Sequence, residues 1–461
     1  MSLRMNRRTF LGHSAGAAAG LVILRCAASA RGAPANGKLN VALVGLGGRG
    51  EWFVDTIPKM ENVVALCDVN EIKAAKAYAK YPDIRKFQDF RKMLDEMGKS
   101  VDAVVIATPD HTHAVISAAA MKAGKHVYCE KPLTRLVHES RVLRETARKQ
   151  KVATQLGNQG TASEPFRRAV ELIRGGVIGQ VKEVYVWNNG GGPGATQPPQ
   201  GTQPVPDTLK WDLWLGPAAD RPFHADWLAK WHGWRDFATG QLGNWASHSA
   251  NLAFMALSVD TLWRADPAKD PNPILGIEAK VSEINRLSFP KWEVIKFDIP
   301  ARAGLPPITI QWHNGGSAPG SRDLLEAAMG EGLDWGDKGE KKWRDHAGTV
   351  IVGTEGKIHA TGHNATFRLL PEEKFKDFKA PAPTLPRSPG HEREWFDACR
   401  GGPAAMSNFD YGGPLAEFLL LGNLATQFDH KLQYDPVAGK IIGDDKADQG
   451  LRGEYRQGWT L

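Results

Sequence analysis

Three glycines near the start of the chain have the spacing of a dinucleotide-binding loop. Gly45, Gly47 and Gly50 form a G-x-G-x-x-G pattern between an apolar stretch, VALV, and a stretch with helical character. The first glycine permits a tight turn, the second lets the backbone approach a pyrophosphate, and the third allows close helix–strand packing. Free N–H groups at the start of the helix would bind the phosphates. A loop without a ligand is the alternative, but the context favours a dinucleotide site formed by Gly45, Leu46, Gly47, Gly48, Arg49 and Gly50.

An aspartate at the end of the next apolar stretch indicates which dinucleotide binds. Asp68 follows NVVALC, 23 residues after Gly45. A carboxylate in this position accepts hydrogen bonds from the adenosine ribose hydroxyls and repels a 2′-phosphate. The three residues after Asp68 include no cation, and Arg49 is the only nearby residue that would argue otherwise. We therefore predict NAD as the cofactor, with NADP as the weaker alternative.

Two further groups of polar residues follow apolar stretches. Thr108, Pro109 and His111 come after AVVI, and Glu130 and Lys131 come at the end of HVYCEK. Ligands of open parallel sheets bind at the carboxyl ends of the strands, so we expect these residues near the dinucleotide. A histidine two residues after His111 would face another way on a helix, and no cysteine or carboxylate stands at ligand spacing, so no metal site is predicted.

The strand and helix patterns around these residues resemble the Gfo/Idh/MocA oxidoreductase family over essentially the whole chain after the first 35 residues. The most specific feature is Glu130-Lys131-Pro132, the E-K-P motif of that family. The resemblance implies that Lys131 reaches a substrate hydroxyl beside the nicotinamide, and that the Lys–Pro bond is often cis. It also implies that Asn158 lies where the domain junction meets the cleft. Without the resemblance, Lys131 would be read as an ordinary surface cation.

A second signature of the family is altered in this chain. Relatives carry an aspartate and a histidine four residues apart on one helix, and here the positions hold Asn244 and His248. Histidine accepts a proton near neutral pH, so His248 is predicted as the proton acceptor. Asparagine cannot ionise and only orients its partners. Asp236 is predicted as a substitute carboxylate, with a structural role in a turn as the alternative.

A cluster of aromatic residues suggests the substrate. Seven of the 15 tryptophans lie within residues 187–245, with histidines and acids between them. Indole rings suit the C–H faces of a sugar, although most of these residues are expected to pack in a core or a dimer interface. We predict a carbohydrate substrate that contacts Trp234, Arg235 and His248.

The elements that position these residues alternate in type over the first third of the chain. Apolar stretches and helical patterns alternate over residues 38–157, which predicts a doubly wound parallel Rossmann sheet. Residues 158–461 carry alternating polar and apolar strands and three strong helical patterns, at 163–176, 390–401 and 413–428. The predicted fold is therefore α/β, with a C-terminal α+β domain that contains a large, mostly antiparallel sheet. We expect this second domain to bind substrate and to form a homo-oligomer.

Residues 1–35 have the pattern of an export signal. Arg7 and Arg8 precede a weakly apolar stretch, and two A-x-A sequences end near residues 30 and 35. The apolar run is too short for a comfortable membrane span. We expect twin-arginine export to the periplasm, the alternative being a terminus processed or unstructured without that pathway. Without the five arginines of this segment the net charge falls from +7 to +2, which argues against nucleic-acid binding.

Three functions fit these residues. The first is an NAD-dependent oxidoreductase that acts on a sugar hydroxyl and holds its cofactor tightly, because no free NAD pool is expected outside the cytoplasm. The second is a glycosidase or lyase that uses bound NAD catalytically and leaves it unchanged. The third, suggested by Asn244, is a non-catalytic sugar-binding protein that retains NAD.

Overall fold

The computed structural model describes residues 37–266, 273–335 and 345–461. The predicted export signal therefore lies outside the described residues, and its function stays a prediction. No helix among the described residues is both long enough and apolar enough to cross a bilayer.

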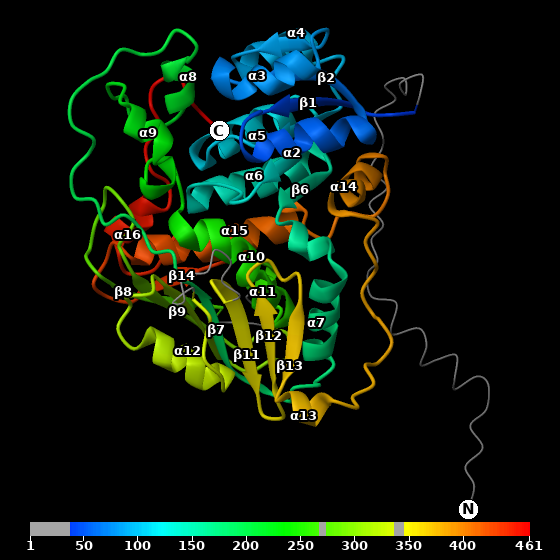
Figure 1. Cartoon of the computed structure of the whole chain (residues 1–461), viewed down its shortest axis with the longest axis vertical. Helices are drawn as coiled ribbons and strands as arrows, with labels where there is room; N and C mark the ends of the chain where they lie inside the picture. The colour runs from blue at the N-terminus through cyan, green and yellow to red at the C-terminus, as the bar shows by residue number, and fades with distance from the viewer. Residues whose placement is uncertain (1–36, 267–272, 336–344) are drawn as a thin grey trace, which may run out of the picture. The chain divides into compact units, whose positions relative to one another are not determined.

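A parallel sheet of six strands occupies one part of the molecule, at the top of Figure 1. Its order is β3-β2-β1-β4-β5-β6, which places the glycine loop after the central strand β1. The strands are β1 (Asn40–Val44), β2 (Asn62–Cys67), β3 (Arg85–Phe87), β4 (Ala103–Ile106), β5 (His126–Glu130) and β6 (Thr154–Gly157). The helices are α2 (Arg49–Thr56), α3 (Glu71–Lys80), α4 (Phe90–Met97), α5 (Asp110–Lys122) and α6 (Val137–Gln150). The predicted Rossmann sheet is confirmed; only the short edge strand β3 was not foreseen.

A second sheet of nine strands has the order β13-β12-β11-β7-β10-β9-β8-β14-β15. All of its pairs are antiparallel except β7 with β10, so the prediction of a mostly antiparallel sheet is confirmed. Its strands are β7 (Val181–Asn188), β8 (Leu275–Val281), β9 (Glu293–Ile299), β10 (Ile308–Asn314), β11 (Ala347–Gly353), β12 (Lys357–Thr361), β13 (Phe367–Leu370), β14 (Leu432–Asp435) and β15 (Lys440–Ile441). The helices that accompany it are α7 (Glu164–Arg174), α8 (Trp211–Leu215), α9 (Ala225–Ala229), α10 (Ser247–Ser249), α11 (Asn251–Ala256), α12 (Ser321–Met329), α13 (Glu372–Phe375), α14 (His391–Cys399), α15 (Phe409–Ala425) and α16 (Asp445–Gly450).

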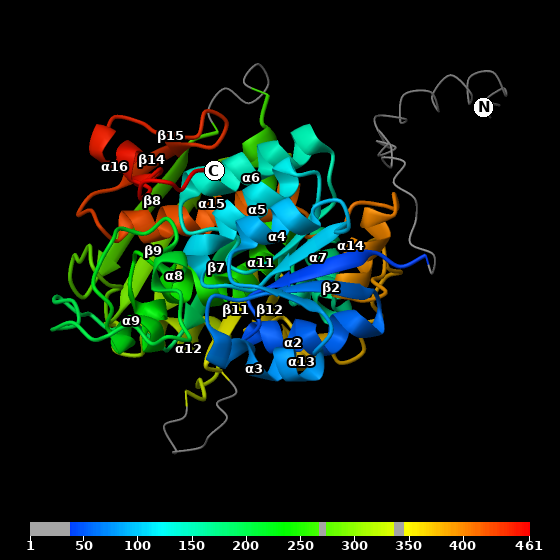
Figure 2. The same cartoon turned by 90° about the horizontal axis from the view of Figure 1, so that it is seen from above.

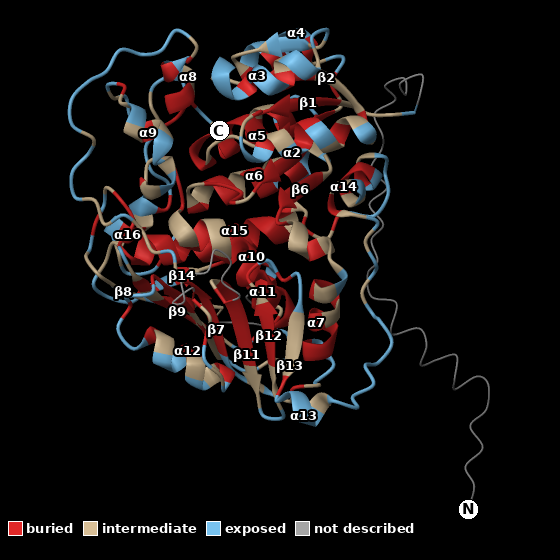
Figure 3. Ribbon diagram, viewed as in Figure 1, coloured by how far each residue is buried: buried red, intermediate tan, exposed pale blue. Residues whose placement is uncertain are grey.

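Helix α15 lies between the two sheets. It packs on α6 of the parallel part and on β8 and β9 of the second sheet. Figure 2 shows α5, α6 and α15 near one another in the middle of the molecule, and Figure 3 shows α15 as part of the buried interior. The sequence of α15 is apolar on every side, which is typical of a helix that is surrounded by protein. The two sheets thus share one interior; a division into domains at residues 157 and 158 stays a prediction.

A buried ion pair joins α15 to both parts of the molecule. Glu417, which is fully buried, accepts hydrogen bonds from Arg141 Nη1 at 3.1 Å, Trp263 Nε1 at 2.8 Å and the Tyr434 hydroxyl at 2.8 Å. Burial raises the pKa of Glu417, and the Arg141 and Arg144 guanidiniums oppose that shift. A buried carboxylate with three donors is stable only while its partners stay in place.

We predict that Glu417→Leu lowers the free energy of unfolding by roughly 3–5 kcal/mol, because the change leaves the Arg141 guanidinium buried without its carboxylate. Urea unfolding followed by tryptophan fluorescence measures the loss. Glu278→Leu, at an exposed position on β8, is the control and should change stability by less than about 0.5 kcal/mol. An equally small effect of Glu417→Leu would contradict the prediction.

Candidate active site

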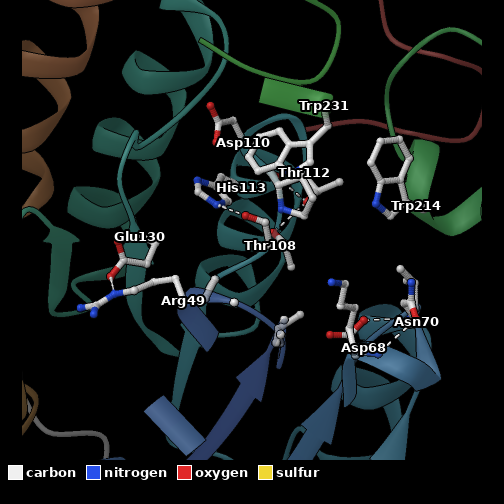
Figure 4. Close-up of a pocket in the computed structure, with 18 of the residues that line it drawn as sticks. Arg49, Asp68, Asn70, Thr108, Asp110, Thr112, His113, Glu130, Trp214 and Trp231 are labelled. Carbon is white, nitrogen blue, oxygen red and sulfur yellow. Dashed lines mark hydrogen bonds and ion pairs between the residues drawn. The ribbon is translucent and has the colours of Figure 1, made fainter. Parts of the chain in front are cut away.

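A cavity of about 950 Å³ opens at the carboxyl edge of the parallel sheet. Its lining comes from the loops after β1, β2, β4 and β5, from helix α5, and from residues 213–248 and 363 of the C-terminal part. In Figure 4, Asp68 and Asn70 lie toward one end, Arg49 and Glu130 toward the other, and Thr108 and His113 between them. The cavity therefore lies where open parallel sheets bind their ligands.

The glycine loop has the geometry that a pyrophosphate requires. Gly45 has φ +84°, and a Cβ there would lie 2.5 Å from the Ala107 carbonyl oxygen. A Cβ on Gly50 would lie 2.1 Å from the Gly45 oxygen, and one on Gly47 would lie 2.9 Å from Lys73 Cβ. Gly45, Gly47 and Gly48 line the cavity, with Leu46 and Gly50 behind them. The loop forms a cradle of bare backbone, which fits a dinucleotide.

Asp68 is fixed at the end of β2 by the glycine loop itself. Its Oδ2 accepts a hydrogen bond from Leu46 N at 2.8 Å, and its Oδ1 accepts one from Asn70 N at 2.8 Å. Burial raises the pKa of Asp68, and these N–H groups oppose the shift. Each oxygen keeps a lone pair for a ribose hydroxyl. Lys73, on α3, also lines this end of the cavity and is a cation that the sequence prediction did not weigh.

The loop between β4 and α5 lines the middle of the cavity. The histidine that lines it is His113, whereas the sequence predicted His111. Thr108 and Pro109 line the cavity, and so does His113, whose ring nitrogens lie 2.7 Å from the carbonyl oxygens of Thr108 and Pro132. His111 does not line it. Its Nε2 lies 2.8 Å from the Trp214 oxygen, and burial lowers its pKa to about 3. Because α5 begins at Asp110, His111 and His113 point to opposite sides, and His113 is on the cavity side.

Lys131 follows β5 and lines the cavity. The peptide bond between Lys131 and Pro132 is cis. Its Nζ donates to the side-chain oxygen of Asn244 and, at 3.2 Å, to the backbone oxygen of the same residue. Burial lowers the pKa of Lys131, while the charges of Glu130 and Asp110 oppose that shift. Burial in turn raises the pKa of Asp110 to about 6. The ammonium is thus held by neutral oxygens, with acidic groups only at longer range.

Asn244 and His248 face the same cavity as Lys131. Asn244 lies in a turn of π-helix, Leu242–Ala246, which continues into α10 with His248. His248 is 6% exposed, and burial lowers its pKa well below the usual value, with further lowering from the Lys131 and His363 charges. Its Nδ1 has no hydrogen-bond partner among the described residues, and its ring lies 4.7 Å from that of His363. The imidazole is therefore neutral and has a ring nitrogen that no described residue binds, while the Lys131 charge opposes its protonation.

Glu130 closes the cavity at the glycine-loop end. Its Oε1 accepts hydrogen bonds from Arg49 Nε at 2.9 Å and from Gln159 Nε2 at 2.7 Å. Asn158 was predicted for this site, but it is fully buried and bonds Ser407 and the Ser247 oxygen instead. Gln159, one residue later, is the residue that lines the cavity.

Three predicted residues of the C-terminal part lie outside the lining of this cavity. Asp236 is half-exposed and forms an ion pair with Arg221, which agrees with a structural role for Asp236 and not with a role in proton transfer. Arg235 is partly buried and donates to the carbonyl oxygens of Asn285 at 2.8 Å and Ser288 at 3.0 Å, so it holds a loop in place. Trp234 lines a second cavity beside the first.

Three histidines of the cavity were not predicted as site residues: His113, His232 and His363. His232 and His363 are both exposed along the cavity, and desolvation within it together with the Lys131 charge lowers the pKa of each. His363 follows β12, far from the other site residues in sequence, and no pattern around it signals a site. No group of histidines, cysteines and acids in the described ranges could hold a metal ion.

We predict that Asn244→Asp raises the pKa of Lys131 by about 1–3 units, because the new carboxylate would lie in hydrogen-bond contact with the ammonium. Competitive acetylation at a series of pH values, with Lys131 quantified by mass spectrometry, measures that pKa. In the unaltered protein Lys131 should titrate below 10.5, the usual value. Asn189→Asp, which lies outside this cavity, should leave the titration unchanged; a shift of the same size there would refute the local cause.

Comparisons with known proteins agree with this geometry. Residues 39–158 match the family described as GFO_IDH_MocA, oxidoreductase family, NAD-binding Rossmann fold. Levoglucosan dehydrogenase of Pseudarthrobacter phenanthrenivorans is 30% identical over 156 residues, which cover 31% of this chain and 39% of that protein. A glycosyl hydrolase family 109 protein of Stenotrophomonas maltophilia is 35% identical over 139 residues, 27% of this chain and 29% of that protein. The chain thus spans about two fifths or less of these relatives.

The fold extends the likeness beyond the matched residues. The WlbA dehydrogenase of Bordetella pertussis, solved with NADH and UDP-GlcNAcA, superposes with a TM-score of 0.55 at 16% identity, over 86% of this chain and 98% of that one. At that identity the likeness concerns the fold alone. Residues 39–158, which contain the glycine loop, Asp68 and Glu130-Lys131-Pro132, are thus similar to the NAD-binding Rossmann part of the Gfo/Idh/MocA oxidoreductase family.

Proposed function

We propose that the protein is an NAD-dependent oxidoreductase that acts on a hydroxyl group of a carbohydrate. The observation that carries this proposal is a single cavity that joins the glycine loop and Asp68 to Lys131, Asn244 and His248. The dinucleotide end and the proton-handling end are therefore parts of one site. The sugar dehydrogenases among the relatives support a carbohydrate as the substrate.

The chain's own residues have distinct tasks in this reaction. A bound nicotinamide supplies the hydride acceptor. His248, neutral and buried, accepts the proton of the substrate hydroxyl. Lys131 stabilises the negative charge that develops on that oxygen, since its ammonium lies in a water-poor site. Asn244 orients Lys131 through its amide and backbone oxygens without taking part in proton transfer.

A second function, a glycosidase or lyase that leaves its bound NAD unchanged, uses the same residues. The similarity to a glycosyl hydrolase family 109 protein favours it. The two functions differ in product: a keto sugar indicates net oxidation, and a cleaved glycosidic bond indicates the glycosidase. A non-catalytic sugar-binding protein is disfavoured because Lys131 and His248 both face the cavity.

We predict that Lys131→Met and His248→Ala each lower turnover by roughly 10²–10⁴-fold while the protein keeps its bound dinucleotide, since a general acid–base group contributes about that much. Turnover on a panel of sugars and glycosides, with product analysis, measures the effect. Lys122→Met, on the far end of α5, is the control. Full activity of both variants would show that other residues transfer the proton.

The proposal also includes export through the twin-arginine pathway, and homo-oligomer formation stays a prediction. Export of a folded protein would require the cofactor to be loaded beforehand.

We predict that the purified protein, desalted and then denatured, releases close to one NAD(H) per chain and little NADP(H), because Asp68 repels a 2′-phosphate. Chromatography of the released dinucleotide decides this. A protein that emerges empty, or that releases NADP(H), would contradict tight NAD binding.

A further inference from the structure

A second cavity, of about 590 Å³, adjoins the proposed active site. His232 lines both cavities and stands between them. The second cavity is formed by residues 190–199, by the segment from Asp226 to Trp234, and by Gly240, Gln241 and Phe289. Its volume lies within the range of small-molecule sites, about 300–1,000 Å³. None of the residues that handle the proton lines it.

The glycine- and proline-rich wall of this cavity is a built structure. Gly192 N donates to the Pro290 oxygen at 2.9 Å, and Gly194 N donates to the Phe289 oxygen at 2.9 Å. A Cβ on Gly192 would lie 2.4 Å from the Pro290 oxygen, so the two segments pack backbone against backbone. The Ala195 oxygen accepts further hydrogen bonds from Asn285 Nδ2 at 2.7 Å and Ser288 Oγ at 2.9 Å. These contacts fix the wall before any ligand arrives.

Two residues of the lining carry buried polar atoms without partners. Trp234 is 6% exposed, and its Nε1 has no hydrogen-bond partner in the described part of the chain. Gln241 Oε1 is likewise buried and unpartnered. A buried polar group without a partner costs about 1–3 kcal/mol, so a ligand that supplied an acceptor to Trp234 Nε1 and a donor to Gln241 Oε1 would gain affinity from both.

The rest of the lining narrows the chemistry of that ligand. Phe289 and the prolines at 193, 198 and 199 offer apolar surface, and the Asp226–Lys230 ion pair, 2.9 Å, adds exposed polar groups. A sugar ring combines apolar C–H faces with hydroxyls that both donate and accept, which matches apolar walls with a few polar groups. A purely apolar group would leave Trp234 Nε1 and Gln241 Oε1 unpaired.

We propose that the second cavity is a subsite for another sugar residue of the substrate, so that the enzyme acts on a disaccharide or longer glycoside in preference to a free monosaccharide. This inference rests on the proposed function. In this arrangement the reacting sugar lies by Lys131 and His248. The neighbouring sugar unit of the glycoside lies beyond His232 and contacts Trp234, Gln241 and Phe289.

Kinetics with matched sugar pairs test the subsite. The probes are glucose with cellobiose, galactose with lactose, and N-acetylglucosamine with N,N′-diacetylchitobiose, each supplied to the NAD-loaded full chain. For the pair that is turned over, the disaccharide should have a KM at least about tenfold lower. Trp234→Phe and Gln241→Leu should each raise that KM about fivefold more than they raise the KM for the monosaccharide, as expected for the loss of one hydrogen bond.

Trp335→Phe is the matched control, because Trp335 is also buried but packs under Arg322, away from the linings of the two cavities. It should change neither KM. The subsite is overturned if the two KM values within a pair are equal, or if Trp234→Phe raises both KM values by the same factor. It is also overturned if octyl glucoside has a KM as far below that of glucose as cellobiose has.

Calorimetric titration of the same disaccharides into the NAD-loaded protein separates the subsite from the proposed reaction. Binding that weakens with Trp234→Phe but not with Trp335→Phe supports the subsite even where no sugar is turned over, in which case the proposed function fails alone. Disaccharide binding that is no tighter than monosaccharide binding overturns the subsite, whatever the outcome for turnover.

Discussion

The partly buried ammonium of Lys131 is the constraint on which the site depends. A cation in a water-poor cavity is stable only when oxygens surround it, and here Asn244 supplies two of them from the C-terminal part of the chain. That contact joins the end of β5 to the π-helical turn, and it places His248 one turn farther along the same segment. Burial lowers the pKa of Lys131, and the charges of Glu130 and Asp110 oppose that shift, since the Asn244 amide itself carries no charge.

The second sheet and α15 make this contact possible. Helix α15 packs on α6 and on the second sheet, and the buried Glu417 carboxylate links it to Arg141 and Tyr434. Residues that line the cavity from the C-terminal part, such as His363 after β12, follow elements of this second sheet. The parallel part supplies the glycine loop, Asp68 and Lys131 to the cavity lining, and the C-terminal part supplies Asn244, His248 and His363.

Much of the fold and part of the site follow from local pattern. Strands β1, β2 and β4 are largely apolar runs. The glycine spacing specifies a turn that only a bare backbone can make, as the close approach of Gly45 to Ala107 shows. The short edge strand β3 and the parallel pair of β7 with β10 left no such pattern. His111 and His113 both follow β4, so the sequence pattern does not distinguish which of them faces the cavity. The residue at which α5 begins sets that side, and it turns His113 toward the cavity.

The sequence by itself determined the residues that follow the strands of the parallel sheet: the glycine loop after β1, Asp68 at the end of β2, and Glu130-Lys131-Pro132 at the end of β5. The tertiary structure alone decided which distant side chains meet them. Asp236 pairs with Arg221, Arg235 binds loop carbonyl oxygens, Asn158 is buried away from the cavity, and His363 enters it. The physical reason is that a short-range pattern reflects backbone geometry and burial, whereas the partner of a polar side chain depends on how separate segments, 15 to 249 residues apart in these examples, are packed together.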